Sequence, residues 1–228
     1  MTATEELVAR VAATTGPCRE DIWSQIIQQA QAKDVLELGV FRGAFAEHIL
    51  RHCRSIMQYY MLDPWRHLDD WNKPANVDQS KFDDIYALAM ATTDFARERR
   101  IVLRGTTTEM IDEISDAGLD IAYIDGDHTL RGIAIDLIRT YPKIRPGGIL
   151  GGDDYTATIW QHADNFEPTL VCPFAAYFAE SQGAPLVILP HNQFAIIKPS
   201  KSGFYFRVID TTQSYGARSL LPQISKPV

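Results

Sequence analysis

Apolar runs and amphipathic segments alternate through the middle of the chain. Short apolar runs, typical of buried strands, occupy residues 34–40, 59–63, 100–105 and 119–125. Each is followed by a segment whose apolar residues recur with a helical period, at residues 44–53, 82–97, 108–115 and 130–144. Strands that alternate with helices are typical of βαβ units, which place their strands parallel in one sheet.

The two ends of the chain follow other patterns. Residues 3–14 and 19–32 have the pattern of two helices, which Gly16-Pro17 separates. Residues 184–200 contain two apolar runs around His191-Asn192, a cue for a β-hairpin. We therefore predict an α/β fold, a doubly wound, Rossmann-like, seven-stranded and mostly parallel sheet with an antiparallel C-terminal hairpin. The predicted units are an N-terminal helical element (1–32), a main domain (33–199) and a C-terminal extension (200–228).

Composition and charge limit the classes of molecule that the protein is expected to bind. The 228 residues carry a net charge of −7, and Glu98 interrupts the one tight basic cluster, at residues 97–100. Affinity for nucleic acid depends on neutralising phosphates, so a nucleic-acid partner is not expected. No apolar run approaches the roughly 18 residues that a membrane span needs, and the N-terminus lacks a basic segment before an apolar block. Three scattered cysteines without metal or redox spacing predict reduced thiols in a cytoplasmic protein.

The turn after the first strand, E-L-G-V-F-R-G, spaces its glycines as G-x-x-x-G. Gly39 and Gly43 would let a ligand approach bare backbone, and the helix that follows offers free N–H groups. A tight strand-to-helix turn, with Gly43 as a packing contact, is the alternative. The dinucleotide fingerprint needs a third glycine that this turn lacks. Asp63 ends the second strand, where a carboxylate can accept both hydroxyls of a ribose or can cap a helix.

Three carboxylates close the fourth and fifth predicted strands. Asp125 follows one strand, and Asp153 and Asp154 follow the other, so a parallel sheet would bring them to the same edge. They would repel one another unless a cation joined them, and oxygen ligands favour Mg²⁺, with Mn²⁺ or Ca²⁺ as substitutes. Helix capping, or pairing with lysine and arginine, is the alternative. His128 lies three residues past Asp125 and could act as a general base, although a lone histidine at a helix start is more often structural.

The segment between Pro64 and Phe82 is polar, rich in aromatic residues and too long for an ordinary connection. We expect a functional loop or lid there. Aromatic residues near the strand ends, Trp65 and Tyr155 among them, could form a wall that stacks on the substrate. Ordinary core packing is the alternative for these rings.

Together these motifs resemble the S-adenosylmethionine site of class I methyltransferases. The segment from Leu119 to Tyr155, LDIAYIDGDHTL through GGDDY, is similar to the small-molecule O-methyltransferases related to macrocin and mycinamicin sugar methyltransferases. It is more distantly similar to the metal-dependent catechol O-methyltransferases. The resemblance covers about residues 33–198 and implies that residues 33–199 form a methyltransferase domain. It also implies that Asp125, Asp153 and Asp154 hold a divalent ion that binds two oxygens of the substrate.

The resemblance assigns further roles. It implies ribose contact from Asp63 and adenine-side contacts from Thr107 and Thr108, which match the family pattern loosely. A capping box from Thr106 to Glu109 is the alternative for this turn. The sugar enzymes carry a histidine near the position of His128, whereas the catechol enzymes carry a lysine there. The cofactor-binding residues expected are therefore Glu37, Gly39, Phe41, Arg42, Gly43, Asp63, Thr107, Thr108 and Asp125.

We therefore expect an S-adenosylmethionine-dependent, Mg²⁺-assisted O-methyltransferase that acts on a hydroxyl of a small polar molecule, with a saccharide or glycoside favoured. His128 and Asp125 would be its catalytic residues, and Trp65 and Tyr155 would contact the substrate. A catechol or polyphenol is the alternative acceptor. A same-fold hydroxylase-like protein and a non-catalytic nucleoside-binding protein are the alternatives outside this class. The N-terminal helices and the C-terminal extension could form a homodimer interface.

Overall fold

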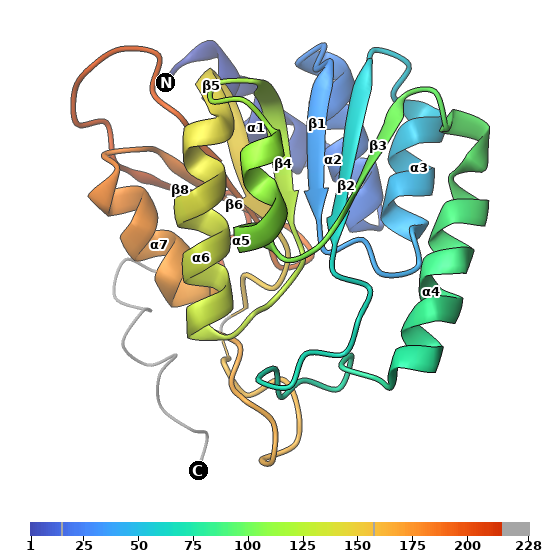
Figure 1. Cartoon of the computed structure of the whole chain (residues 1–228). Helices are drawn as coiled ribbons and strands as arrows, with labels where there is room; N and C mark the ends of the chain where they lie inside the picture. Colours follow the sequence, from blue (N-terminus) through green and yellow to red (C-terminus); the bar gives the residue numbers. More distant parts are fainter. Residues whose placement is uncertain (15, 157, 216–228) are drawn as a thin grey trace.

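The computed structural model describes residues 1–14, 16–156 and 158–215, and at its centre lies one twisted sheet with helices on both faces (Figure 1). The strands are β1 (Asp34–Leu38), β2 (Gln58–Asp63), β3 (Arg100–Arg104), β4 (Leu119–Ile124), β5 (Ile144–Gly152), β6 (Leu186–Leu189), β7 (Gln193–Ile197) and β8 (Val208–Asp210). They lie in the order β3-β2-β1-β4-β5-β7-β6-β8. The doubly wound α/β fold is confirmed, but the sheet has eight strands where seven were predicted.

The first five strands pair in parallel, and β7 runs antiparallel to both β5 and β6. His191 and Asn192 adopt the left-handed backbone between β6 and β7, so the predicted hairpin is confirmed. The additional strand, β8, pairs in parallel with β6 and lies within the predicted C-terminal extension. Residues 216–228 of that extension lie outside the described part of the chain.

The helices form two layers. Helices α1 (Ala3–Thr14), α2 (Arg19–Gln29), α3 (Ala44–His52) and α4 (Gln79–Thr92) cover one face of the sheet. Helices α5 (Thr107–Met110), α6 (Leu130–Thr140) and α7 (Val171–Ser181) cover the other face (Figure 1). Short 3₁₀ turns follow three of them, at Asp94–Ala96, Ile111–Glu113 and Tyr141–Lys143. The sequence patterns did not predict α7.

Successive residues of the central strands point to opposite faces of the sheet and fill two separate cores. Val35 packs against the layer of α1 to α4, whereas its neighbour Leu36 packs against the layer of α5 to α7. Trp23 of α2 is fully buried in the same core as Val35. The N-terminal helices therefore close one face of the sheet.

The site is positioned by the reversal of strand order between β1 and β4, where ligands bind in open α/β sheets. Two long loops lie beyond the carboxyl ends of the strands, toward the bottom of Figure 1. We call residues 64–78 the lid loop, and residues 153–156 and 158–170 the outer loop. Cys18, Cys53 and Cys172 are not joined in disulfides. Among the described residues, no helix has the length and apolarity that crossing a bilayer requires.

Candidate functional site

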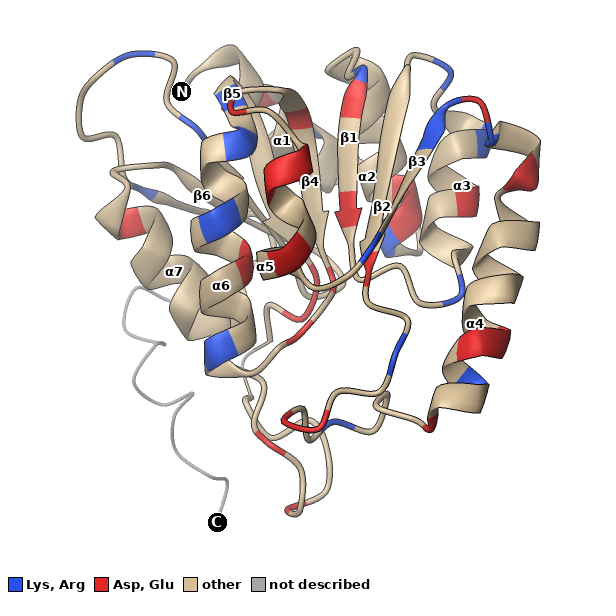
Figure 2. Cartoon of the chain, in the orientation of Figure 1, with Lys and Arg blue, Asp and Glu red and all other residues tan. Residues whose placement is uncertain are grey.

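A cavity of about 760 Å³ opens at the carboxyl ends of β1, β2 and β4. Figure 2 shows acidic residues at this end of β1 and β2. Many of the predicted site residues line the cavity: Glu37, Gly39, Phe41, Arg42, Asp63, Thr107, Thr108, Asp125, His128 and Asp154. Four others do not line it: Gly43, Trp65, Asp153 and Tyr155. One cavity therefore joins the glycine turn to the acidic cluster.

The glycine turn packs tightly against the end of β4. Gly39 has φ +88°, and a Cβ atom there would lie 2.1 Å from the backbone oxygen of Asp125. Only glycine tolerates both this backbone and this contact. Gly43, with φ +79°, caps α3, and a Cβ atom there would lie 3.2 Å from Ala89 Cα in α4. Gly43 is thus the packing contact named as an alternative, whereas Gly39 faces the cavity.

Asp63 holds the glycine turn in shape. Its Oδ2 atom accepts hydrogen bonds from the backbone N–H groups of Val40 and Phe41, at 2.9 and 2.8 Å, and its Oδ1 accepts from Trp65 N at 2.8 Å. Burial raises the pKa of Asp63, and the three N–H donors offset part of that rise. Asp63 lines the cavity as well, so bracing the turn and meeting a ligand are compatible roles.

Glu37 is fully buried inside β1 on the cavity floor. Tyr59 donates its hydroxyl proton to Glu37 Oε2 at 2.7 Å. Burial nevertheless raises the pKa of Glu37 well above its usual value, because desolvation penalises the charged form more than this one bond stabilises it. Glu37 therefore places a buried carboxyl group with a raised pKa at the base of the cavity.

The threonine turn after β3 forms the capping box named as the alternative, because the Thr106 side chain and the Glu109 side chain each bond the backbone of the other residue. Thr107 donates its hydroxyl proton to Asp136 Oδ1 at 2.5 Å. Burial raises the pKa of Asp136 to about 7, although the Thr107 bond lowers it in part. The sequence analysis missed Asp136; its signal was an acidic residue within the apolar stretch IAIDLI of α6.

The carboxylates at the ends of β4 and β5 do come together, and an arginine that we did not predict joins them. Arg19, at the start of α2, places its Nη1 atom 2.8 Å from Asp125 Oδ2 and forms an ion pair with Asp153. Its guanidinium also lies over the rings of Phe45 and Tyr123, at 5.8 and 6.0 Å from their centroids. The N-terminal helices thus contribute a charged side chain to the site.

His128 bridges the other carboxylates of this cluster. Its Nδ1 lies 2.5 Å from Asp154 Oδ2, and its Nε2 lies 3.4 Å from Asp125 Oδ1 without a hydrogen bond. Burial pulls the pKa of His128 down, but the two carboxylates outweigh it and raise the pKa to about 9. We expected a neutral imidazole, whereas these neighbours favour the charged form at neutral pH.

The carboxylate oxygens of the cluster are already engaged by protein groups. Asp153 Oδ1 accepts from Gln193 Nε2 and from the backbone N–H of Asp154, the latter at 2.7 Å. Asp154 Oδ1 accepts from Gln161 Nε2 at 3.4 Å, and the four remaining oxygens face Arg19 or His128. Within residues 1–14, 16–156 and 158–215, no group of three or more His, Cys, Asp or Glu is arranged to hold a metal ion. The predicted Mg²⁺ site at Asp125, Asp153 and Asp154 therefore does not fit this arrangement.

The two aromatic residues expected to contact the substrate are buried in the core. Trp65 is fully buried, and its Nε1 atom donates to the backbone oxygen of Phe41 at 2.8 Å. Tyr155 is 2% exposed and packs against Phe194 and Tyr215. The core-packing alternative thus describes both rings, because the glycine turn covers one and the C-terminal strands cover the other.

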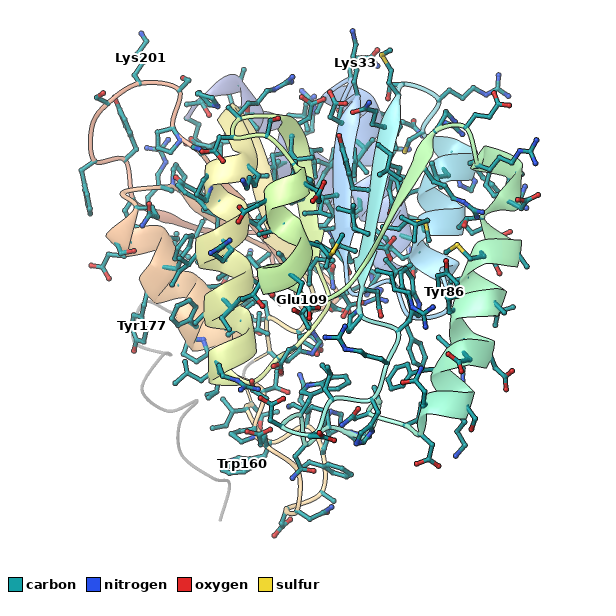
Figure 3. The ribbon with its side chains drawn as sticks, in the orientation of Figure 1. Lys33, Tyr86, Glu109, Trp160, Tyr177 and Lys201 are labelled. Atoms are coloured by element: carbon teal, nitrogen blue, oxygen red, sulfur yellow. The ribbon has the colours of Figure 1, made fainter. Side chains whose placement is uncertain are left out.

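Trp71 of the lid loop lines the cavity, and its Nε1 atom donates to Asp127 Oδ1 at 3.0 Å. Lys73 is buried and donates to the backbone oxygen of Glu167 at 2.8 Å, which ties the lid loop to the outer loop. In Figure 3, Trp160 marks the outer loop at one end of the molecule and Lys33 marks the opposite end. The lid loop therefore forms one wall of the cavity.

The chain is similar to known methyltransferases in sequence and in fold. A family model described as "Methyltransferase domain" matches residues 36–155, more than half of the chain. None of the curated proteins matches the sequence significantly. The solved structure of the O-methyltransferase from Bacillus cereus in complex with SAH is 17% identical, with a TM-score of 0.54 over 87% of this chain and 92% of that chain. TomG from Streptomyces achromogenes, involved in tomaymycin synthesis and solved with SAM, is 12% identical, with a TM-score of 0.54 over 87% and 91%. At these identities the solved structures bear on the fold alone.

Proposed function

Given that the chain belongs to the methyltransferase-domain family, we propose that it transfers a methyl group from S-adenosylmethionine to a hydroxyl group of a small polar molecule. The observation that carries the proposal is the single cavity that joins the glycine turn and Asp63 to His128 and Asp154. A methyl transfer of this kind needs donor and acceptor held in line in one water-excluded space. The two solved methyltransferases in complex with SAH or SAM support the choice of donor.

The donor would lie along the cavity floor. The backbone of Gly39 to Arg42 would meet its methionine end, Asp63 its ribose, and Thr107 and Thr108 its adenine side. Of these threonines, Thr107 already donates its hydroxyl to Asp136, so the adenine side would meet the hydroxyl of Thr108 and the backbone of the turn. Glu37, beneath the turn, would offer its buried carboxyl group to the methionine end.

The acceptor hydroxyl would approach His128. Asp154 fixes the ring through Nδ1, which leaves Nε2 without a hydrogen-bond partner among the described residues. In the proposed step the hydroxyl gives its proton to Nε2 of the neutral ring, and its oxygen bonds to the methyl carbon. The bond from that carbon to the sulfonium sulfur breaks, and S-adenosylhomocysteine leaves.

For the acceptor class, we infer a saccharide or glycoside. The inference rests on the resemblance of residues 119–155 to macrocin and mycinamicin methyltransferases, in particular on a histidine rather than a lysine at position 128. A catechol or polyphenol is the alternative, and Trp71 in the cavity wall could stack on either kind of ring.

The test has two stages. Calorimetric titration of the purified protein with S-adenosylhomocysteine is expected to show one saturable site, and Asp63→Ala is expected to weaken it at least about tenfold by loosening the turn. A panel of glycosides and catechols is then incubated with S-adenosylmethionine, and methylated product is detected by mass spectrometry. No binding would contradict the proposal entirely. Binding without transfer to any hydroxyl would leave a nucleoside-binding protein.

A further inference from the structure

Arg19 lies where a cation is needed, between two carboxylates that would otherwise repel each other. One guanidinium nitrogen pairs with both Asp125 and Asp153, although these residues follow different strands and Arg19 lies on an N-terminal helix. A guanidinium presents several N–H donors in a rigid plane, which suits it to bridging carboxylates. The cluster therefore contains its own positive charge.

The position of Arg19 is fixed by packing. Its guanidinium rests over the rings of Phe45 and Tyr123, which stack on each other at 4.0 Å between centroids. One turn along α2, Trp23 is fully buried and donates to Gln193 Oε1 at 3.0 Å. Because ring packing and a buried hydrogen bond both hold this end of α2, the arginine is directed into the cluster.

Gln193 fixes the carboxylate as well as the helix. The same amide that accepts from Trp23 Nε1 and from Tyr123 OH donates through Nε2 to Asp153 Oδ1. Asp153 is consequently held toward Arg19 and away from the cavity, which it does not line. A divalent ion would need Asp153 to turn and the guanidinium to leave, since Mg²⁺ requires close oxygen ligands in nearly octahedral geometry.

We propose that Arg19 takes the place of a divalent cation in this cluster, so that the wild-type protein binds none there and loss of Arg19 opens a cation site. The proposal differs from our sequence-based expectation of Mg²⁺. It concerns cation binding in the absence of donor and acceptor, so it stands or falls independently of the proposed methyl transfer.

The experiment is a titration of the full-length protein with Mn²⁺, followed by electron paramagnetic resonance of the free ion and by thermal melting. Wild type and Arg10→Gln, which removes an equal charge from α1, are expected to show no saturable binding up to about 1 mM. Arg19→Gln is expected to bind one Mn²⁺ at least about tenfold more tightly, with a higher melting temperature in its presence. Adding Asp153→Asn to Arg19→Gln should abolish that binding.

Two results would overturn the proposal. One is saturable Mn²⁺ binding by the wild type that Asp153→Asn removes. The other is a folded Arg19→Gln protein, with an unchanged circular dichroism spectrum, that binds no Mn²⁺. If Arg19→Gln fails to fold, Arg19→Lys replaces it. An ammonium group is less suited than a guanidinium to bridging two carboxylates. Mn²⁺ binding by Arg19→Lys is therefore expected to be stronger than that of wild type and weaker than that expected of Arg19→Gln. Wild-type behaviour from that variant would equally count against the proposal.

Discussion

At the scale of single residues, His128 shows how two neighbouring carboxylates change what an imidazole can do. Asp125 and Asp154 raise its pKa to about 9, so the neutral ring that accepts a proton is scarce at pH 7 and becomes common as the pH approaches 9. With an acceptor from the substrate panel, we expect the methyl-transfer rate at saturating donor to rise through this range.

His128→Gln is the matched variant, because it keeps a polar side chain but cannot accept the proton. We expect kcat to fall by about 10²–10⁴ and the rise with pH to disappear. A wild-type rate that is flat between pH 7 and 9, or a variant that retains the rise, would assign proton transfer to another group.

Asp136 makes a second prediction, which concerns stability. Because its pKa is raised to about 7 in the folded state, the fold binds this proton more tightly than the unfolded chain does. Its contribution is fully present below about pH 4 and is lost as the pH rises through about 7. Between pH 5 and pH 8 the wild-type protein passes through about two of these pH units, each equivalent to about 1.4 kcal/mol. We therefore expect the stability of Asp136→Asn relative to wild type to increase by at most about 3 kcal/mol from pH 5 to pH 8.

Urea unfolding of both proteins at pH 5 and pH 8 measures this difference. Asp84→Asn, an exposed position on α4, serves as the control and should show the same pH dependence as wild type. Equal pH dependence of Asp136→Asn and wild type would contradict the prediction.

The residues that the sequence predicted and those it missed differ in how they reach the site. Asp63, Asp125 and Asp154 follow the ends of predicted strands, so the parallel sheet alone brings them together. Arg19 reaches the cluster from a helix that packs on the sheet face, and no spacing in the sequence reports that approach. The raised pKa of His128 depends on the orientation of two carboxylates, which the sequence does not specify.

At the scale of elements, the turn after β1 depends on one glycine. In Gly39→Ala the added Cβ would meet the backbone oxygen of Asp125 at 2.1 Å in addition to the strain of φ +88°. We expect a loss of at least about 2 kcal/mol in the free energy of unfolding, measured by urea titration.

Gly147 supplies the matched control for this substitution. Its φ is +82°, but a Cβ atom there would meet nothing within 4 Å. Gly147→Ala therefore isolates the backbone strain and should cost about 1 kcal/mol. If the two variants were equally stable, close approach to Asp125 would not be what requires glycine at position 39.

Two of the contacts that hold the lid loop differ in strength. The hydrogen bond from Trp71 to Asp127 is partly buried. The ion pair between Asp70 and Arg131 joins side chains that are 69% and 58% exposed. Exposed ion pairs contribute little, and a partly buried hydrogen bond contributes about 1 kcal/mol. We expect Trp71→Phe to raise the KM for the acceptor about fivefold and Arg131→Met to change it less than about twofold. The opposite order would mean that the surface pair holds the lid.

The sequence pattern predicts some helices and strands and misses others. Helices such as α3 and α6 have one apolar face and one polar face, so their apolar residues recur with the helical period that identifies a helix in a sequence. The sequence of α7, VCPFAAYFAES, is apolar almost all round, with a proline in its first turn, so that signal is absent. The three residues of β8 are too few to establish a pattern, and only their pairing with β6 defines the strand.

At the scale of the whole molecule, we predict that the chain does not fold without its first 32 residues. Five side chains of the first 32 residues are at most 1% exposed and lie in the core between the sheet and helices α1 to α4: Val8, Ile22, Trp23, Ile26 and Ile27. Burial of each such side chain contributes about 1.5–3 kcal/mol, and five of them together match the whole stability of a typical domain, about 5–15 kcal/mol. Circular dichroism and urea unfolding of a protein starting at residue 33 would show a non-cooperative transition. A cooperative one would establish residues 33–199 as an independent domain.

The buried amide of Gln193 joins Trp23, near the start of the chain, to Asp153, and Trp23 and Gln193 lie 170 residues apart. A ribosome adds roughly 5–20 residues per second, so the early helix waits about 10–30 seconds for Gln193 to be synthesised. Until then the nascent sheet carries an incomplete active centre at its rim. The cluster is thus completed only after β7 has been synthesised, and a chain terminated before residue 193 would have the glycine turn without the bond that orients Asp153.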